Sequence, residues 1–218
     1  MGPQDLRVGM SAPATAPTPT GWRRIQNRQD YREFLRDDLT AHGLQRWSFY
    51  LAPKHPELAY QRLLRRVEYA QTKRGILGRV LYAFHRLRLA RRAVITGISI
   101  PPGVFGPGLS VAHLGSIVVN DRARVGSWCR IHSGTNIGVH DGGVPTIGTH
   151  VYIAPGAVAF GGITVGDGVA IGANAVLTTD VPDGVTVGGI PARVISQGGS
   201  AGSLPEWFPR LEERTDND

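Results

Sequence analysis

Four histidines in the second half of the chain are the side chains best suited to chemistry. They are His113 in "VAHLGSIVVN", His132 in "CRIHSGTNIG", and His140 and His150 beyond it. A neutral imidazole can take the proton of a hydroxyl as that hydroxyl attacks a carbonyl carbon, and can then protonate the leaving group. An imidazole also ligates metal ions, or forms structural hydrogen bonds inside a core. The sequence around each histidine has to indicate which of these roles it has.

His113 stands in register with a series of aliphatic residues that recur every six positions, with one longer step. The members of the series are Val119, Val125, Ile131, Ile137, Ile147, Ile153, Ala159, Val165, Ile171 and Leu177. A strand repeats about every two residues and a helix about every 3.6, whereas a period of six is typical of a hexapeptide solenoid. Three hexads close one triangular coil, and stacked coils turn the series into buried aliphatic columns. The sequence therefore predicts a parallel β-helix over residues 96–196.

The longer step lies between Ile137 and Ile147, where "GVHDGGVPTI" adds four residues to the repeat. An insertion in a solenoid forms a loop on one face, commonly the face that binds a ligand. A surface insertion without a function is the alternative. We expect His140, which lies in this loop, to contact a ligand, and His150 to be a surface residue at a corner.

The first half of the chain has helical periodicity instead. Asp30 and Glu33 have capping-box spacing ahead of "YREFLRDDLTAHG", and Gly43 is a suitable stop. Two more amphipathic helices are expected, with apolar stripes that must pack on each other or on the solenoid. The first stripe consists of Tyr60, Leu63, Leu64 and Val67, and the second of Leu77, Val80, Leu81, Phe84 and either Leu87 or Arg88. Residues 21–95 are thus predicted to form a basic α-helical segment.

Charge is distributed unevenly between the two halves. Residues 22–92 contain 17 Lys or Arg against 6 Asp or Glu, whereas residues 98–196 contain four Arg against five Asp. The basic faces either are solvated surface or attract an anionic partner, such as a phosphate-bearing cofactor, a nucleotide-linked sugar or a lipid surface. Nucleic acid is not expected, because no binding motif accompanies the charge.

The remaining segments limit the class of protein. No apolar run is long enough to span a membrane, and the first residues lack the apolar core of a secretory signal. The single cysteine, Cys129, excludes an intramolecular disulfide and fits a reducing compartment, so a cytoplasmic protein is expected. Residues 1–20 are expected to be a disordered tail and residues 197–218 a flexible C-terminal tail. In that second tail, Trp207 and Phe208 are candidates to pack on the prism or on a neighbour.

The stretch "IGTHVYIAPGAVAFGGITVGDGVAIGANAVLTTDVPDGVTVGGIPARVI" resembles the C-terminal half of the hexapeptide acyltransferases, most of all the serine O-acetyltransferase family and its polysaccharide-biosynthesis relatives. The likeness includes "RLLRRVEYAQTKRGILGRVLYAFHRLRLARR" and "IPPGVFGPGLSVAHLGSIVVN", and covers about residues 30–196. It implies a left-handed parallel β-helix that forms a homotrimer, with acetyl-CoA in a cleft between adjacent prisms. It also implies a general-base histidine at the position of His113, and a helical segment able to join two trimers.

The resemblance also assigns a coenzyme site. In this family the pantetheine arm of acetyl-CoA is held mainly by backbone groups at corners of small residues. The corresponding positions here are Ala154, Pro155, Gly156, Ala173 and Asn174. Arg193, in "IPARVI", is placed to approach the nucleotide phosphates.

Two alternatives to an O-acetyltransferase remain. Carbonic anhydrases of the γ class share this architecture, but their zinc site needs two histidines close together in sequence, and the four histidines here include no such pair. No metal is therefore expected. A β-helix that serves only as an assembly scaffold is the non-enzymatic alternative, and acetyl-CoA consumption with a hydroxyl acceptor would separate it from an enzyme.

The acceptor is predicted from residues that depart from the serine acetyltransferase pattern. Ala112 and Ser99 stand where that family has aspartates, and Gly143 and Val144 where it has an arginine and a histidine. Free serine carries an ammonium and a carboxylate, and each costs on the order of several kcal/mol when half-buried without a partner. A saccharide hydroxyl needs only polar neighbours, and the candidates are Ser116, Asn120, His132, Asn136 and His140. We therefore expect O-acetylation of a surface or capsular polysaccharide precursor, with L-serine as the alternative acceptor.

Overall fold

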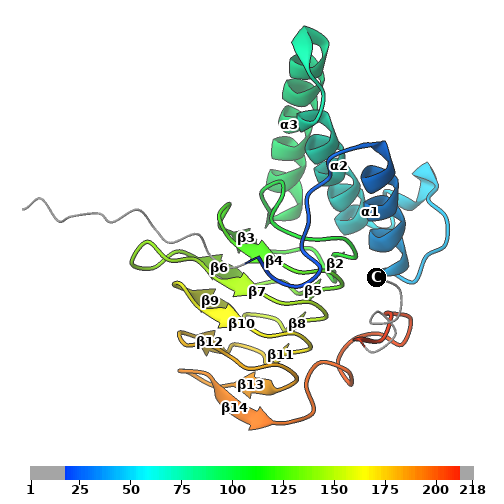
Figure 1. The fold of residues 1–218 in the computed structure, drawn as a ribbon. Coiled ribbons are helices and arrows are strands. Elements are labelled where there is room, and N and C mark those ends of the chain that lie inside the picture. Colours follow the sequence, from blue (N-terminus) through cyan, green and yellow to red (C-terminus); the bar gives the residue numbers. More distant parts are fainter. Residues whose placement is uncertain (1–17, 212–218) are drawn as a thin grey trace, which may run out of the picture.

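Short parallel strands stack into a triangular solenoid, and helices lie at the end where the solenoid begins (Figure 1). The computed structural model describes residues 18–211. Most of the expected N-terminal tail (residues 1–17) and the end of the expected C-terminal tail (residues 212–218) lie outside the described part. The predicted parallel β-helix is confirmed.

Three sheets form the faces of the prism, and the chain passes through them in a fixed order on each turn. The first sheet contains β1 (Ile98–Ser99), β3 (Ile117–Val119), β6 (Asn136–Gly138), β9 (Val158–Phe160) and β12 (Val176–Leu177). The second sheet contains β4 (Arg124–Val125), β7 (Thr146–Ile147) and β10 (Thr164–Val165). The third contains β2 (Ser110–Val111), β5 (Arg130–Ile131), β8 (Tyr152–Ile153), β11 (Ala170–Ile171), β13 (Thr186–Gly188) and β14 (Arg193–Ser196). Only β14 pairs antiparallel among these strands, and it ends the third sheet.

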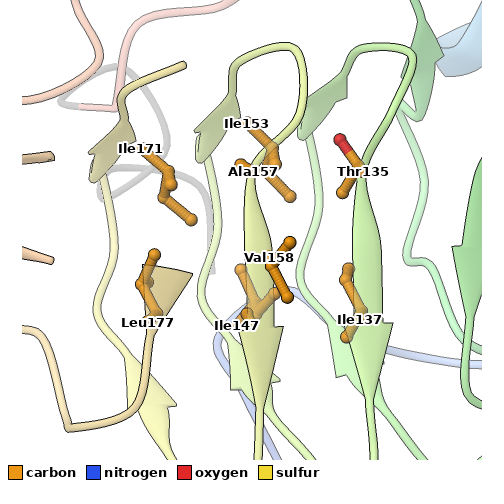
Figure 2. A pocket seen from close by; sticks show the side chains of 9 residues that line it. Thr135, Ile137, Ile147, Ile153, Ala157, Val158, Ile171 and Leu177 are labelled. Carbon is orange, nitrogen blue, oxygen red and sulfur yellow. The ribbon is translucent and has the colours of Figure 1, made fainter. Parts of the chain in front are cut away.

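The interior of the prism is a packed aliphatic core (Figure 2). Residues of the six-residue series pair directly one turn apart, as Ile131 does with Ile153 and Ile137 with Ala159. Every member of the series is at most 5% exposed. The space between these side chains is too small for a water molecule. The interior therefore stabilises the fold, and ligands have to bind outside it.

Helix α1 (Arg28–Thr40) begins earlier than its predicted cap. The Asn27 side chain accepts hydrogen bonds from the backbone N–H groups of Gln29 and Asp30, and the Asp30 carboxylate accepts from the Asn27 N–H. Asp30 therefore occupies the N3 position of the capping box, and Asn27 is the N-cap, where the spacing with Glu33 had predicted Asp30. The one-turn helix η1 (Phe49–Leu51), α2 (Pro56–Gln71) and α3 (Gly75–Thr96) follow.

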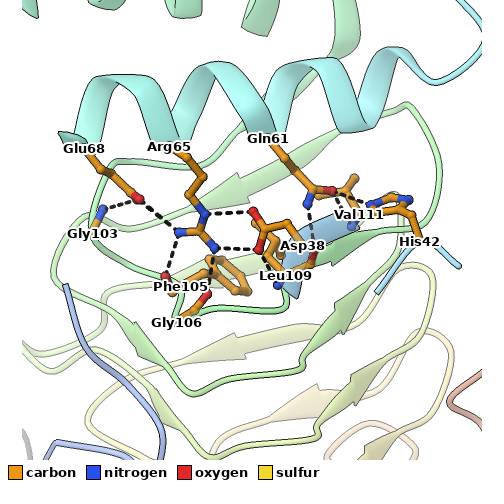
Figure 3. A network of polar contacts seen from close by, with 10 residues as sticks. All are labelled: Asp38, His42, Gln61, Arg65, Glu68, Gly103, Phe105, Gly106, Leu109 and Val111. Atoms are coloured by element: carbon orange, nitrogen blue, oxygen red, sulfur yellow. Dashed lines mark hydrogen bonds and ion pairs between the residues drawn. The ribbon is translucent and has the colours of Figure 1, made fainter. Parts of the chain in front are cut away.

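Helix α2 covers the open edge of the first turn (Figure 3). Strand β2 has a strand neighbour on one side only, so its outer backbone groups need other partners. The Gln61 amide donates to the Leu109 carbonyl at 2.6 Å and accepts from the Val111 N–H at 2.9 Å. The Tyr60 hydroxyl likewise donates to the Ile100 carbonyl and accepts from the Ile100 N–H. These two side chains take the place of a missing strand.

Arg65 of α2 ties both helices to the same edge through a buried ionic network (Figure 3). Its guanidinium donates to Asp38 of α1 at 2.8 and 3.1 Å, and to Glu68 at 3.0 Å. It also donates to the carbonyls of Phe105 and Gly106, at 2.9 and 2.7 Å. Every donor of the guanidinium has an acceptor, which offsets the large cost of burying its charge.

The apolar stripe predicted for α2 is buried, but the prediction for α3 is wrong. The α2 stripe is at most 7% exposed, whereas Leu77, Val80, Leu81, Phe84 and Leu87 of α3 are 42–77% exposed. Helix α3 instead turns the face with Gly78 and Leu89 inward. A Cβ on Gly78 would meet the Lys73 carbonyl oxygen, so the tight connection between α2 and α3 fixes which face points in. Within residues 18–211, no helix is long and apolar enough to cross a membrane.

The described part of the C-terminal tail packs on the chain itself. The Trp207 indole donates to the Ala41 carbonyl at 3.3 Å, and the ring of Phe208 lies 6.0 Å from that of Trp128. The Ser200 hydroxyl donates to the His150 carbonyl at 2.6 Å. His150 is only 3% exposed, so its predicted place on the surface is wrong, because this returning segment covers it.

Candidate active site

One corner of the prism carries most of the predicted site. It is the turn from the third sheet to the first, and it recurs between β2 and β3, β5 and β6, β8 and β9, and β11 and β12. Successive copies of the corner contain His113 to Ser116, His132 to Thr135, Ala154 to Gly156, and Ala173 to Asn174. Backbone hydrogen bonds connect them: Gly134 to Ser116 at 2.6 Å, Gly156 to Ser133 at 3.0 Å, and Asn174 to Pro155 at 3.0 Å. We call this stack the histidine corner.

His113 is exposed at the first level of the histidine corner. A structural histidine would be buried and hydrogen-bonded, and His113 is neither within residues 18–211. Its ring lies 5.7 Å from that of His132, edge to face. An accessible imidazole held by its neighbours can reach a bound hydroxyl, which is what a general base requires.

His132 is partly buried one turn further along. Burial, followed by the charges of Arg130 and His113, lowers the pKa of His132 to about 4. Its Nε2 is buried and has no hydrogen-bond partner among the described residues. Its other face meets the ring of Tyr152 at 5.1 Å. His132 is therefore a neutral group at pH 7, with one buried polar atom that has no partner among the described residues.

Arg130 is a site residue that the sequence analysis did not identify. It lies on β5 and precedes His132 by two positions, and since His132 directly follows the strand, the period of two directs both side chains to the same side. Its Nη1 donates to the Ser110 hydroxyl at 2.9 Å, and no carboxylate of residues 18–211 pairs with it. Burial lowers the pKa of the Arg130 guanidinium. The strand period of two was the available signal, but a single Arg on a strand face usually indicates solvated surface.

The other predicted acceptor residues do not all gather at the histidine corner. Ser116 lies exposed on it, and Asn136 lies exposed on the neighbouring first sheet, in register with Val118. Asn120 lies at the next corner, where its side chain accepts from the Arg122 N–H at 2.9 Å. That hydrogen bond closes a turn and gives Asn120 a structural role.

His140 also lies at the next corner, in the inserted loop between β6 and β7. It is exposed, with its ring 5.6 Å from that of Phe160 and its Nε2 3.3 Å from Asp141. The face of the first sheet separates this corner from the one with His113. One chain therefore does not bring His140 and His113 together.

The predicted coenzyme positions form the later levels of the histidine corner. Gly156 has a φ of +74°, and a Cβ there would collide with the Asn174 side chain. Glycine thus allows two levels of the corner to touch and leaves backbone groups accessible. Arg193 is exposed on β14, beyond the last turn, and donates to the Ala192 carbonyl at 2.8 Å.

No group of three His, Cys, Asp or Glu side chains in residues 18–211 could hold a metal ion. The pair of His113 and His132 has no third ligand, so the γ carbonic anhydrase alternative has no site in the described residues.

An exposed histidine on the corner of a hexapeptide solenoid defines the class of hexapeptide acyltransferases expected from the sequence. No family model matches the chain. It is 36% identical over 132 residues to a serine acetyltransferase of Helicobacter pylori strain J99, covering 55% of this chain and 77% of the relative. It is 38% identical over 111 residues to that of Synechococcus elongatus, covering 49% of this chain and 46% of the relative. The chain thus spans about half the length of some curated relatives it matches.

Solved structures agree with these relatives. A serine acetyltransferase of Brucella abortus superposes with a TM-score of 0.66 at 28% identity, over 78% of this chain and 71% of that one. The soybean apoenzyme superposes with a TM-score of 0.60 at 27% identity, over 77% and 69%. The chain belongs to the serine acetyltransferase family.

This finding overturns the predicted saccharide acceptor. The matched proteins are serine acetyltransferases in both comparisons, and nothing in them supports a polysaccharide subtype. The prediction relied on missing charged residues at positions 99, 112, 143 and 144. It overlooked Arg130, a cation already beside His132, so the absence of the usual partners does not leave the site without charge.

Proposed function

We propose that the protein transfers an acetyl group from acetyl-CoA to the side-chain hydroxyl of L-serine, giving O-acetyl-L-serine and free coenzyme A. The observation that carries this proposal is the 36% identity over 77% of a serine acetyltransferase, together with His113 exposed on the histidine corner. A solved serine acetyltransferase in complex with CoA superposes on the chain with a TM-score of 0.58 at 25% identity.

His113 is the proposed general base. Its neutral ring nitrogen takes the proton of the serine hydroxyl while the oxygen attacks the thioester carbonyl carbon. The tetrahedral intermediate then collapses, the C–S bond breaks, and the imidazolium returns the proton to the leaving thiolate. The ring ends the cycle neutral, and this assistance is worth roughly 10²- to 10⁴-fold in rate.

Acetyl-CoA is proposed to bind along the later levels of the histidine corner. The residues there fit a thin, amide-containing arm. No side chain projects from Gly156, and the side chains of Ala154 and Ala173 are small, so the backbone is accessible. Backbone groups would hold the arm, and Arg193 would approach the phosphates. The same corner then presents the thioester to His113.

Arg130 is proposed to bind the carboxylate of serine. A guanidinium has five N–H donors, and Ser110 is its single hydrogen-bonding side-chain partner in the described residues. Partial burial strengthens its attraction for an anion, because less water competes. A positively charged group beside His132 gives the site what an amino-acid acceptor needs and an uncharged acceptor does not.

The active assembly is proposed to be a homotrimer. The first sheet separates His113 from His140, so a site that uses both histidines needs the histidine corner of one copy and the inserted loop of the next. A closed ring of three copies provides this contact identically at each interface.

Release of coenzyme A from acetyl-CoA, followed with a thiol reagent, tests the function. L-Serine should give saturable turnover and a product whose mass is that of O-acetylserine. Ethanolamine, which lacks the carboxylate, and 3-hydroxypropionate, which lacks the ammonium, are matched control acceptors and should react poorly. Failure to acetylate L-serine by a preparation that binds acetyl-CoA would refute the proposal.

A further inference from the structure

Helix α3 has two apolar faces, and only one of them is covered. The inner face, with Gly78 and Leu89, packs against α2 and the start of the solenoid. The outer face forms an apolar strip that only Arg91 interrupts among its central positions, and we call it the α3 ridge. It consists of Ile76, Leu77, Val80, Leu81, Phe84, Leu87, Val94 and Ile95, each 42–86% exposed. Single exposed apolar residues are ordinary, but a strip along a helix of 22 residues, about 33 Å, marks an interaction surface.

The spacing within the α3 ridge is that of a coiled coil. Its central positions alternate in steps of three and four residues: Leu77, Val80, Phe84, Leu87, Arg91 and Val94. This heptad spacing, with apolar residues at the a and d positions, keeps one seam facing a partner helix. Ile76, Leu81 and Ile95 widen the seam on both sides. A wide seam is covered better by two facing helices than by one.

The direction of α3 suits the same partner. The helix rises beyond the first turn along the direction in which the turns stack (Figure 1). Gly97 ends the helix in a left-handed conformation and β1 begins at Ile98, so α3 is joined rigidly to the solenoid. Solenoids arranged around a threefold axis along this direction would place three α3 helices parallel to one another. This step rests on the homotrimer of the proposed function.

Charge on α3 separates the possible occupants. The helix has five arginines and no acidic residue. Arg79, Arg86 and Arg92 lie outside the seam, where water can solvate them. Arg88 lies beside the seam with its guanidinium over the Phe84 ring, and only Arg91 occupies a central position. An anionic lipid surface would also suit these charges. However, the heptad spacing of the α3 ridge suits a partner helix, whereas a flat lipid surface requires no such spacing.

We propose that the α3 ridge packs against the α3 ridges of two other copies of this chain, forming a parallel three-stranded coiled coil above the solenoid ring. Arg91 weakens this seam, as a charged residue at an a position does, and favours a defined register.

Cysteine pairing tests the arrangement directly. The native Cys129 is buried, so an introduced thiol reports alone. A parallel coil brings Leu77 of one copy to Leu77 of the next. Leu77→Cys should therefore form disulfide-linked dimers under mild oxidation, within particles of trimer mass. Arg79→Cys, also exposed but outside the seam, is the matched control and should not. Pairing of Leu77→Cys only with Val94→Cys in a mixture would show antiparallel helices and overturn the proposal.

Dilution experiments measure the strength of the seam. Arg91→Leu should lower the concentration at which the trimer dissociates by at least tenfold, and Leu77→Asp should raise it by at least tenfold, by analytical ultracentrifugation. Turnover of L-serine by the wild-type protein is measured separately. Failure of the proposed function would appear in that assay, and failure of the coiled coil would appear in the dissociation of the variants. Unchanged dissociation in both variants would overturn the coil. So would ridge-dependent binding to phosphatidylglycerol vesicles without any effect on self-association.

Discussion

The imidazole rings of His113 and His132 lie 5.7 Å apart at successive levels of one corner. The two histidines differ in burial, since His113 is exposed and His132 is partly buried with an unpaired Nε2. The lowered pKa of His132 means that it adds no positive charge beside His113 at pH 7. The proposed site would therefore contain one accessible base, His113, beside a neutral neighbour, with a separate cation in Arg130.

Replacing His113 should abolish most of the activity without unfolding the protein. His113→Ala is expected to reduce kcat by at least ~100-fold, because the serine hydroxyl loses its proton acceptor. The mass of the assembly in solution and the far-UV circular dichroism should stay unchanged, since the side chain is exposed. His55→Ala, at a partly exposed histidine paired with Glu57, is the matched control and should retain full activity. Near-normal turnover by His113→Ala would remove its assigned role.

His132 should make the stability of the protein depend on pH. Its folded pKa of about 4 lies below the value of about 6.5 in an unfolded chain. Between these values the unfolded chain binds the proton and the folded one does not, so the free energy of unfolding falls as the pH drops from about 6.5 toward 4. The Tm of the wild type should thus decrease more between pH 7 and pH 5 than that of His132→Gln. His42 and His85, whose pKa values burial also lowers, are present in both proteins and cancel. Equal decreases would contradict the assignment.

Arg130 should control recognition of the acceptor and not the chemical step. Removing a charged hydrogen bond to the serine carboxylate costs about 1.5–3 kcal/mol, so Arg130→Met should raise the KM for L-serine roughly 10- to 100-fold with little change in kcat. The slow reaction of ethanolamine, which has no carboxylate, should be unaffected. Arg36→Met, at an exposed arginine of α1 that pairs with Asp37 away from the proposed site, is the control. Equal losses with both acceptors would mean that Arg130 only supports the fold.

The solenoid could be predicted from sequence because each hexad has to place one aliphatic side chain in the interior of the prism. Val125 and Ile147 are buried in this way, so the period of six is visible in the linear sequence. Helix α3 could not be oriented in the same way. Both of its faces are apolar, and the contact at Gly78 that selects the inner one depends on the connection from α2.

The histidine corner was predictable in part for a similar reason. The family resemblance placed His113 and the coenzyme corners, and the structure stacks them on one edge. Arg130 escaped because its surroundings come from the neighbouring turns, where Ser110 and Tyr152 pair with it in register, and both are remote from it in sequence. His140 was assigned to the site, although within one chain it lies at a different corner.

The buried network around Arg65 should be essential for stability. Asp38→Ala removes two hydrogen bonds to a fully buried guanidinium and the partner of the Leu109 N–H. Removing one partner of a buried ion pair costs about 3–5 kcal/mol, so the free energy of unfolding in urea should fall by up to that amount, with Glu68 as the remaining partner of Arg65. Arg36→Ala breaks an exposed ion pair on the same helix and should cost less than about 1 kcal/mol. A loss below 1 kcal/mol for Asp38→Ala would show that water reaches Arg65.

Gly156 should be required both for the fold of the histidine corner and for coenzyme binding. Alanine at a left-handed position costs about 1–2 kcal/mol wherever it occurs. At Gly156, with φ of +74°, the new Cβ would also collide with Asn174 and push two levels of the corner apart. Gly184 has a φ of +67° with open space around its Cβ position, so Gly184→Ala isolates the backbone cost. Titration calorimetry should show at least tenfold weaker acetyl-CoA binding for Gly156→Ala and unchanged binding for Gly184→Ala. Equal affinities would place the coenzyme elsewhere on the solenoid, because a displaced corner could not then be its binding surface.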